Sequence, residues 1–128
     1  MVELHGWFVL EEDPDGDELP MTYWDGVRRR VEAVGDNPRG ELRVINGSFR
    51  ALFDGTSNHH NSGVEAVVSV AEWLASSLPR SYGLLHIWDD EDRGDDGNRF
   101  VVYVMKRGRL ERRNDEFLSP IIPTVFDD

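Results

Sequence analysis

The sequence contains no cysteine. A protein without cysteine has no disulfide framework, no thiolate metal site and no thiol nucleophile, which is compatible with a reducing compartment. With 128 residues, the chain is long enough to bury roughly two-thirds of the surface that its unfolded form exposes. We therefore expect one domain, residues 1–128, that folds without covalent cross-links.

Long apolar runs and an export signal are also missing. The best candidate for a membrane span, AVVSVAEWLA, is interrupted by Glu72 and has about half of the ~20 residues that a spanning helix needs. The first ten residues, MVELHGWFVL, place Glu3 where a signal peptide needs a basic start. These absences predict a soluble, cytoplasmic protein with no membrane partner.

Basic residues are scarce, and the excess of acids is local. The chain has 14 lysines and arginines against 25 aspartates and glutamates, and its formal net charge is −11. Residues 11–18 (EEDPDGDE, the first acidic segment) carry −6, and residues 89–97 (DDEDRGDDG, the second acidic segment) carry −5, so together they hold the whole net charge. Nucleic acid is disfavoured as a partner, because clustered lysine and arginine are needed to neutralise phosphates. Concentrated acid instead speeds association with a basic protein.

Apolar periodicity predicts six strands and two helices. Asn46-Gly47 between two short apolar runs is typical of a hairpin turn. Thr22-Tyr23-Trp24-Asp25 has the pattern of a helix start, and Ser62-Gly63-Val64-Glu65 is a capping-box pattern ahead of a second helix. The predicted strands are 2–10, 40–45, 49–53, 82–88, 99–106 and about 109–113, and the helices are 22–34 and 62–78.

This order of elements predicts an α+β fold. Hairpins joined to only two helices favour an about six-stranded, mostly antiparallel sheet with the two helices packed on one face. The last residues contain Pro120 and Pro123 and are predicted to be an extended segment lying on the fold. The pattern leaves open the relative direction of the first and fourth strands, and hence whether the two acidic segments share one rim.

The second acidic segment does not match the pattern of an EF-hand calcium loop. A loop of EF-hand type requires oxygen ligands at positions one, three and five, and a glutamate at position twelve. Counted from Asp90, position five is Gly94 and position twelve is Val101, so this pattern fails. Other carboxylate cages remain an alternative, but we predict no metal and no cofactor.

A polar stretch, DGTSNHHNSG, offers the residue types of a hydrolase or a metal site. It contains Asp54, Ser57, His59 and His60. Adjacent histidines in an extended chain point apart, and the usual helical metal pair is four residues apart. We interpret the stretch as a turn whose polar side chains satisfy backbone groups, and we predict no catalytic residues.

Two His-x-Trp patterns stand in predicted strands. In His5-Gly6-Trp7 and His86-Ile87-Trp88, each histidine and its tryptophan project to one face. Large aromatic side chains are usually core, so the favoured prediction is that both tryptophans pack under a helix. The alternative is that Trp88, beside the second acidic segment, anchors an interface.

The assembled motifs resemble a known family, immunity protein family 7 of bacterial polymorphic toxin systems. The resemblance covers essentially the whole chain and depends on five patterns in order. They are His5-Gly6-Trp7, Asn46-Gly47, Gly55 with Asn58-His59, YGLLHIWDDED from Tyr82, and RGRLERRNDEFLSPIIP from Arg107. His60 stands where we expect the family to favour arginine, so a precise role for that loop does not carry over.

The resemblance implies a small cytoplasmic α+β protein that binds and neutralises a cognate toxin domain and has no activity of its own. Combined with the charge pattern, it predicts a basic toxin that docks on the acidic segments with aromatic anchors, while the free protein is a monomer or a weak dimer. Two alternatives remain: a small metal-dependent hydrolase, and a homo-oligomeric structural domain that buries its aromatic face. The predicted partner-binding residues are Glu11, Glu12, Asp13, Asp15, Asp17, Glu18, Tyr82, Trp88, Asp89, Asp90, Glu91, Asp92, Asp95 and Asp96.

Overall fold

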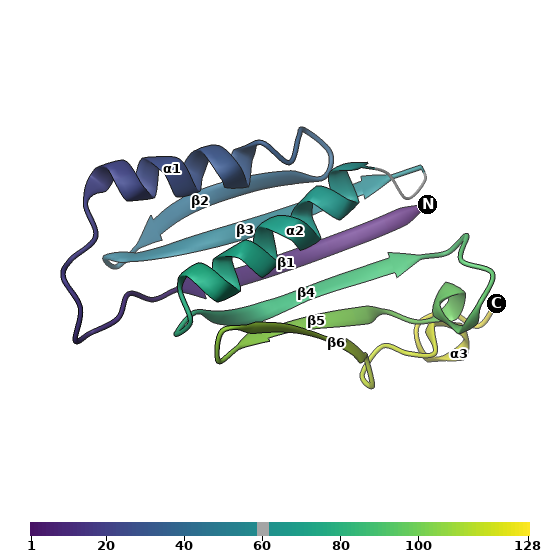
Figure 1. Ribbon diagram of the computed structural model, residues 1–128. Coiled ribbons are helices and arrows are strands. Elements are labelled where there is room, and N and C mark those ends of the chain that lie inside the picture. Colours follow the sequence, from purple (N-terminus) through teal and green to yellow (C-terminus); the bar gives the residue numbers. More distant parts are fainter. Residues whose placement is uncertain (59–61) are drawn as a thin grey trace.

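The computed structural model describes residues 1–58 and 62–128, and these contain a six-stranded antiparallel sheet. The two long helices, α1 and α2, lie on one face of the sheet (Figure 1), which confirms the predicted α+β fold. The strands lie in the order β2-β3-β1-β4-β5-β6. The elements are β1 (Val2–Leu10), α1 (Met21–Glu32), β2 (Arg39–Ile45), β3 (Ser48–Ser57), α2 (Ser62–Ser77), β4 (Tyr82–Asp89), β5 (Val101–Lys106) and β6 (Arg109–Asn114).

Strand β1 lies in the interior of the sheet, paired with β3 on one side and β4 on the other. Its even-numbered apolar residues, Leu4 and Phe8 among them, face the helices and are almost completely buried. Successive strand residues point to opposite faces, so its odd-numbered residues, including His5 and Trp7, lie on the other side. We call that side the open face of the sheet.

The helices cover β1 and its neighbours with an apolar stripe. Helix α1 buries Trp24, Val27 and Val31, and the Trp24 ring stacks on Phe49 at a centroid distance of 4.0 Å. The helix begins at Met21, one residue before the predicted start, and its N-cap is Pro20, without a side-chain hydrogen bond. It ends at Glu32, two residues before the predicted end. Helix α2 begins at Ser62, at the capping-box pattern.

Two strand boundaries differ from the prediction by more than one residue. Strand β3 continues to Ser57, so Asp54 and Ser57 belong to the sheet rather than to a polar turn. This extension is possible because β1 pairs with β3 up to the start of β1, where Val2 lies opposite Ser57. Strand β5 begins at Val101 instead of Arg99, after a short 3-10 turn, η1 (Asp95–Asn98). His59 and His60 lie outside the described residues.

The C-terminal segment is folded against the sheet end by a buried carboxylate. Asp115 accepts hydrogen bonds from the backbone amides of Phe117 (3.0 Å) and Leu118 (2.8 Å) and from the Ser119 hydroxyl (2.8 Å). The segment is not extended throughout, because it contains the short helical turn α3 (Ile121–Thr124), but Ile122 within this turn keeps an extended backbone (φ −106°, ψ 117°). The first residue of the turn, Ile121, is buried, so the segment lies on the fold as predicted.

The two acidic segments lie at opposite ends of the sheet. β1 and β4 are antiparallel neighbours, with Val2 opposite Asp89 and Val9 opposite Tyr82. The first segment follows the end of β1, and the second follows the end of β4, so a whole strand separates them (Figure 1). At about 3.3 Å per residue, this separation is roughly 30 Å. Within the described part of the chain, no helix is long and apolar enough to cross a membrane.

Candidate functional site

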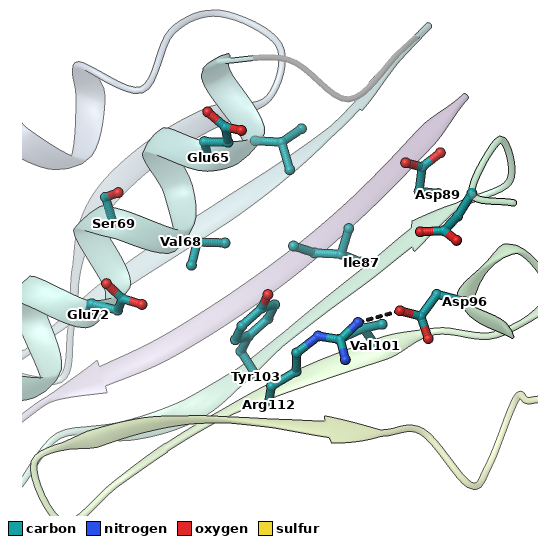
Figure 2. Close-up of a pocket in the computed structure, with 12 residues that line it drawn as sticks. Glu65, Val68, Ser69, Glu72, Ile87, Asp89, Asp96, Val101, Tyr103 and Arg112 are labelled. Atoms are coloured by element: carbon teal, nitrogen blue, oxygen red, sulfur yellow. Dashed lines mark hydrogen bonds and ion pairs between the residues drawn. The ribbon is translucent and has the colours of Figure 1, made fainter. Parts of the chain in front are cut away.

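A groove of about 460 Å³ opens between α2 and the strands β4, β5 and β6, on the helix-bearing side of the sheet (Figure 2). It exists because α1 and α2 cover the other half of that face and leave β5 and β6 partly uncovered. The second acidic segment closes one end. The lining residues are Val64, Glu65, Val68, Ser69, Glu72, Ile87, Asp89, Asp92, Asp96, Val101, Tyr103 and Arg112.

The groove combines an apolar floor with an acidic rim. Val68 of α2, Ile87 of β4 and Val101 of β5 provide aliphatic surface, and Tyr103 adds an aromatic ring. Five carboxylates and one guanidinium line it as well, so its formal charge is strongly negative. Such a surface suits a lysine or arginine, whose aliphatic stem packs on apolar groups while its charged head meets the acids. The acids come from three elements: Glu65 and Glu72 from α2, Asp89 from β4, and Asp92 and Asp96 from the second acidic segment.

The cation of the groove is already paired. Arg112 of β6 donates a hydrogen bond to Asp96 (Figure 2), and the same carboxylate lies 3.5 Å from the guanidinium of Arg99. Asp95 is bound to Arg99 too, at 3.5 Å. Arg112 thus connects the 3-10 turn to the sheet, while the contacts of Arg99 stabilise the turn itself. The remaining acids of the rim determine the charge that a partner meets.

The second acidic segment has a defined conformation. The Trp88 indole Nε1 donates to the carbonyl of Gly97 at 2.9 Å, which ties the far side of the loop back to β4. Asp89 accepts from the backbone amide of Glu91 (3.0 Å), and Asp92 accepts from that of Gly94 (2.7 Å). A Cβ at Gly97 would lie 2.3 Å from the Asp92 carbonyl oxygen, so this close approach requires glycine. Asp90 is exposed and lies 2.6 Å from the amino group of Met1.

Two acids of the first acidic segment also have structural partners. The Glu12 carboxylate accepts from the Leu19 amide at 2.7 Å, and Asp13 accepts from the Asp15 amide at 2.9 Å. The other acids are exposed, at the end of the sheet away from the groove. The structure therefore does not bring the two groups of predicted partner-binding residues together. The exposed acids are Glu11, Asp15, Asp17 and Glu18.

The aromatic residues of both His-x-Trp patterns lie on the open face. Trp7 is 43% exposed, and its ring meets that of Tyr82 edge-to-face at 6.4 Å, so the prediction that it packs under a helix is wrong. Trp88 lies on the same face, half-buried beside Phe100. The parity of β1 and β4 causes this arrangement, because the apolar residues of opposite parity already supply the core.

The two histidines are cross-strand neighbours. His5 Nδ1 lies 2.9 Å from the carboxylate of Asp54, so the side chain of Asp54 is hydrogen-bonded to a residue of the neighbouring strand. Burial lowers the pKa of His86; the Asp115 carboxylate opposes this shift, and nearby His5 adds to it. Within residues 1–58 and 62–128, no three metal-ligating side chains are grouped.

Sequence reasoning missed three residues that shape the groove. Glu65 and Glu72 are seven residues apart on α2, and Arg112 is on β6, a strand predicted only by its polar alternation. The spacing of seven was the available signal, because it places both glutamates on one helix face, beside Val68. Arg112 gave no such signal, because its contact with Asp96 depends on the pairing of β5 with β6.

Comparison with known protein families gives a match over almost the whole chain. The model of the family described as Immunity protein 7 matches residues 1–127. Comparisons with curated proteins and with solved structures gave no match.

Proposed function

Because this chain belongs to the Immunity protein 7 family, we propose that it binds and neutralises a cognate polymorphic toxin domain. The family match over residues 1–127 is the observation that carries this function. We propose that the protein acts by binding and not by catalysis, as a single domain in the cytoplasm. The absence of cysteine supports this compartment, because a fold without disulfides loses nothing in a reducing environment.

We propose the groove and the second acidic segment as the docking site. The support is geometric: five carboxylates surround an apolar floor, and hydrogen bonds from Trp88 and Gly94 hold the loop beside it. Acidic side chains clustered in one groove produce a negative electrostatic potential there, and this potential raises the rate of association with a basic partner. The partner is therefore a toxin with a basic surface that projects a lysine or arginine into the groove.

The first acidic segment is given a smaller part in this mechanism. It lies roughly 30 Å from the second, which exceeds the Debye length of about 8 Å at physiological salt. Its charge is therefore largely screened at the groove. A toxin would have to span the whole sheet to touch both segments, so we assign direct contact to the second one.

The first experiment is copurification of the protein with products of its neighbouring genes, washed with increasing salt. A stoichiometric basic toxin domain, retained less well as salt rises, is the expected result. Cells that express this toxin domain should grow only when the immunity protein is present. A domain that is retained but remains toxic would contradict neutralisation, and no retained protein at low salt would contradict the proposed function as a whole.

A further inference from the structure

The open face of the sheet carries a straight row of side chains across all six strands. The residues are paired in register from one edge strand to the other, so their side chains lie side by side on this face. The row has an acid at each end and four apolar residues between them. In strand order, this central row is Glu41, Leu52, Trp7, Leu84, Val104 and Glu111.

Neither of the two long helices covers the central row. Both long helices lie on the opposite face (Figure 1), and Trp7 is 43% exposed at the middle of the sheet. Leu52, Leu84 and Val104 around it are only half-buried, and neighbouring Tyr82 is 47% exposed. A contiguous apolar patch of this kind on the flat side of a sheet indicates an interaction surface.

The next row along the strands has the complementary charge. On β2, Arg43 lies two residues from Glu41. On β6, Arg109 lies two residues from Glu111, so both ends of this row are basic. Its middle is again apolar, with Val9, which is already buried, opposite the exposed Tyr82. The Nε atom of Arg50, beside Arg43, is buried and has no hydrogen-bond partner among the described residues. This basic row consists of Arg43, Arg50, Val9, Tyr82, Lys106 and Arg109.

We propose that a second copy of this chain covers the open face in a two-fold symmetric sheet-on-sheet dimer. A two-fold axis that runs across the strands, between the two rows, places the central row of each copy on the basic row of the other. Glu41 then meets Arg43 of the second copy and Glu111 meets Arg109, in addition to the ion pairs that they form within their own chain with Arg43 (3.9 Å) and Arg113 (2.6 Å). Trp7 packs among the exposed apolar residues of both rows. A two-fold interface uses the same patch twice, so each of these contacts occurs twice.

Other stackings of two copies are less favourable. An axis parallel to the strands places like charges opposite one another, Arg43 on Arg109 and Glu41 on Glu111. A two-fold axis can also run across the strands on the other side of the central row, between it and the row that contains His5 and His86. This axis buries His5 and its bonded carboxylate, Asp54, in the interface. The ends of that stacking are also complementary, with Glu41 on Arg39 and Glu111 on Arg113. The difference is in the middle, where His5 and Asp54 would lose water, and desolvation of charged groups costs free energy.

The size of the face is sufficient for a weak dimer. Six strands about 4.8 Å apart make it roughly 30 Å wide, and six residues along a strand cover roughly 20 Å. The face therefore offers roughly 600 Å² per copy, at the lower end of specific interfaces. The dimer would leave the groove open on the other side, so it is independent of the proposed function.

Analytical ultracentrifugation over a concentration series tests the dimer directly. The wild-type mass should rise with concentration towards that of two chains. A mass that stays at one chain throughout the series would overturn the proposal. Two charge variants test the register: the basic-face variant Glu41→Arg/Glu111→Arg and the acidic-face variant Arg43→Glu/Arg109→Glu.

Each variant alone should remain monomeric, because like charges would face one another across the two-fold axis. An equal mixture should form a heterodimer, with association at least about tenfold tighter than in either sample alone. Formation of the heterodimer also shows that both variants are folded. Each substitution changes the net charge by two, so starting from −11 the chains carry −7 and −15, and general attraction between opposite net charges cannot explain their pairing.

The matched control is Arg39→Glu/Arg113→Glu, which has the same net charge as the acidic-face variant. Arg39 and Arg113 lie on the same face, at the ends of the row that contains His5 and His86. Arg113 also donates a hydrogen bond to Glu111 of its own chain at 2.6 Å, so the control removes this ion pair as well as changing the net charge. Mixed with the basic-face variant, the control should give no gain in association. Equal or stronger pairing by the control would overturn the proposed register.

Discussion

At the scale of single residues, Asp115 shows how one carboxylate holds a segment whose sequence gives no regular pattern. It is 8% exposed. Burial would raise its pKa, but the amides of Phe117 and Leu118 and the hydroxyl of Ser119 stabilise the charged form, and the net result is a lowered pKa. Phe117-Leu118-Ser119, within the segment RGRLERRNDEFLSPIIP, thus has a structural explanation: two of its backbone amides and the serine hydroxyl are the donors for this carboxylate.

Replacement of Asp115 by Asn should make stability less dependent on acid pH. Because the pKa is lower in the folded chain, the contribution of Asp115 is complete above its unfolded pKa of about 3.9 and is lost as pH falls through the folded value. We expect Asp115→Asn to lower the free energy of unfolding by about 2 kcal/mol at neutral pH. This difference should shrink below that unfolded pKa.

Urea unfolding over a pH series measures the effect, with Glu116→Gln as the control at an exposed neighbour. The control should follow the wild type at every pH. A difference between Asp115→Asn and wild type that stays constant down to acid pH would contradict the assigned role.

Trp88 is the residue through which β4 controls the second acidic segment. Trp88→Phe keeps a ring beside Phe100 but removes the Nε1 donor to Gly97. We expect a loss of about 1 kcal/mol in stability and faster amide hydrogen exchange in residues 94–98. Trp7→Phe, on the same face but away from the loop, should leave exchange in those residues unchanged. Equal exchange in the two variants would contradict a role for the indole.

At the scale of elements, α1 and β2 approach each other closely at Gly40, which has no side chain. A Cβ at Gly40 would lie 2.2 Å from the carbonyl oxygen of Val31 and 2.9 Å from the Phe53 ring. Gly26, inside α1, has only the end of the flexible Arg29 side chain near its Cβ position, at 3.8 Å. The two glycines therefore have opposite consequences when they are replaced.

Gly40→Ala should destabilise the protein by about 1–3 kcal/mol, because the helix must move away from the strand. Gly26→Ala should stabilise it by up to about 1 kcal/mol, because alanine costs less conformational entropy in a helix. Chemical unfolding of both variants provides the comparison. Destabilisation of similar size in both would contradict the assignment of Gly40 to the helix–strand contact.

Element type followed from periodicity, whereas element ends depended on partners. The alternation in β1 and the helical spacing of Val27 and Val31 were sufficient to predict a strand and a helix. The extension of β3 to Ser57 was not predictable, because its reason is the pairing with Val2, far away in the chain. For the candidate site, the sequence predicted the acidic loop but not the groove. Glu72 and Arg112 line the groove only because tertiary packing brings their elements beside the loop.

At the scale of the whole molecule, the two acidic segments provide a matched test of local charge. Glu65→Gln/Glu72→Gln/Asp92→Asn removes three charges at the groove, and Glu11→Gln/Asp15→Asn/Asp17→Asn removes three at the other end of the sheet. The groove variant should slow association with the toxin about tenfold and flatten its salt dependence, whereas the distal variant should change the rate by less than about twofold.

Stopped-flow association rates at several salt concentrations measure this difference. Asn at position 92 retains an acceptor for the Gly94 amide, so the loop conformation should be preserved. Equal slowing by both variants would show that net charge, and not the groove, determines the rate.

The antiparallel pairing of β1 with β4 also determines how the molecule should be attached to a surface. Val2 lies opposite Asp89, so a tag or linker ahead of Met1 would emerge beside the second acidic segment and shield the proposed docking site. Thr22, exposed near the start of α1, lies towards the other end of the sheet (Figure 1). Because the natural chain has no thiol, Thr22→Cys creates a single attachment point that would orient every immobilised molecule with its groove towards the solution.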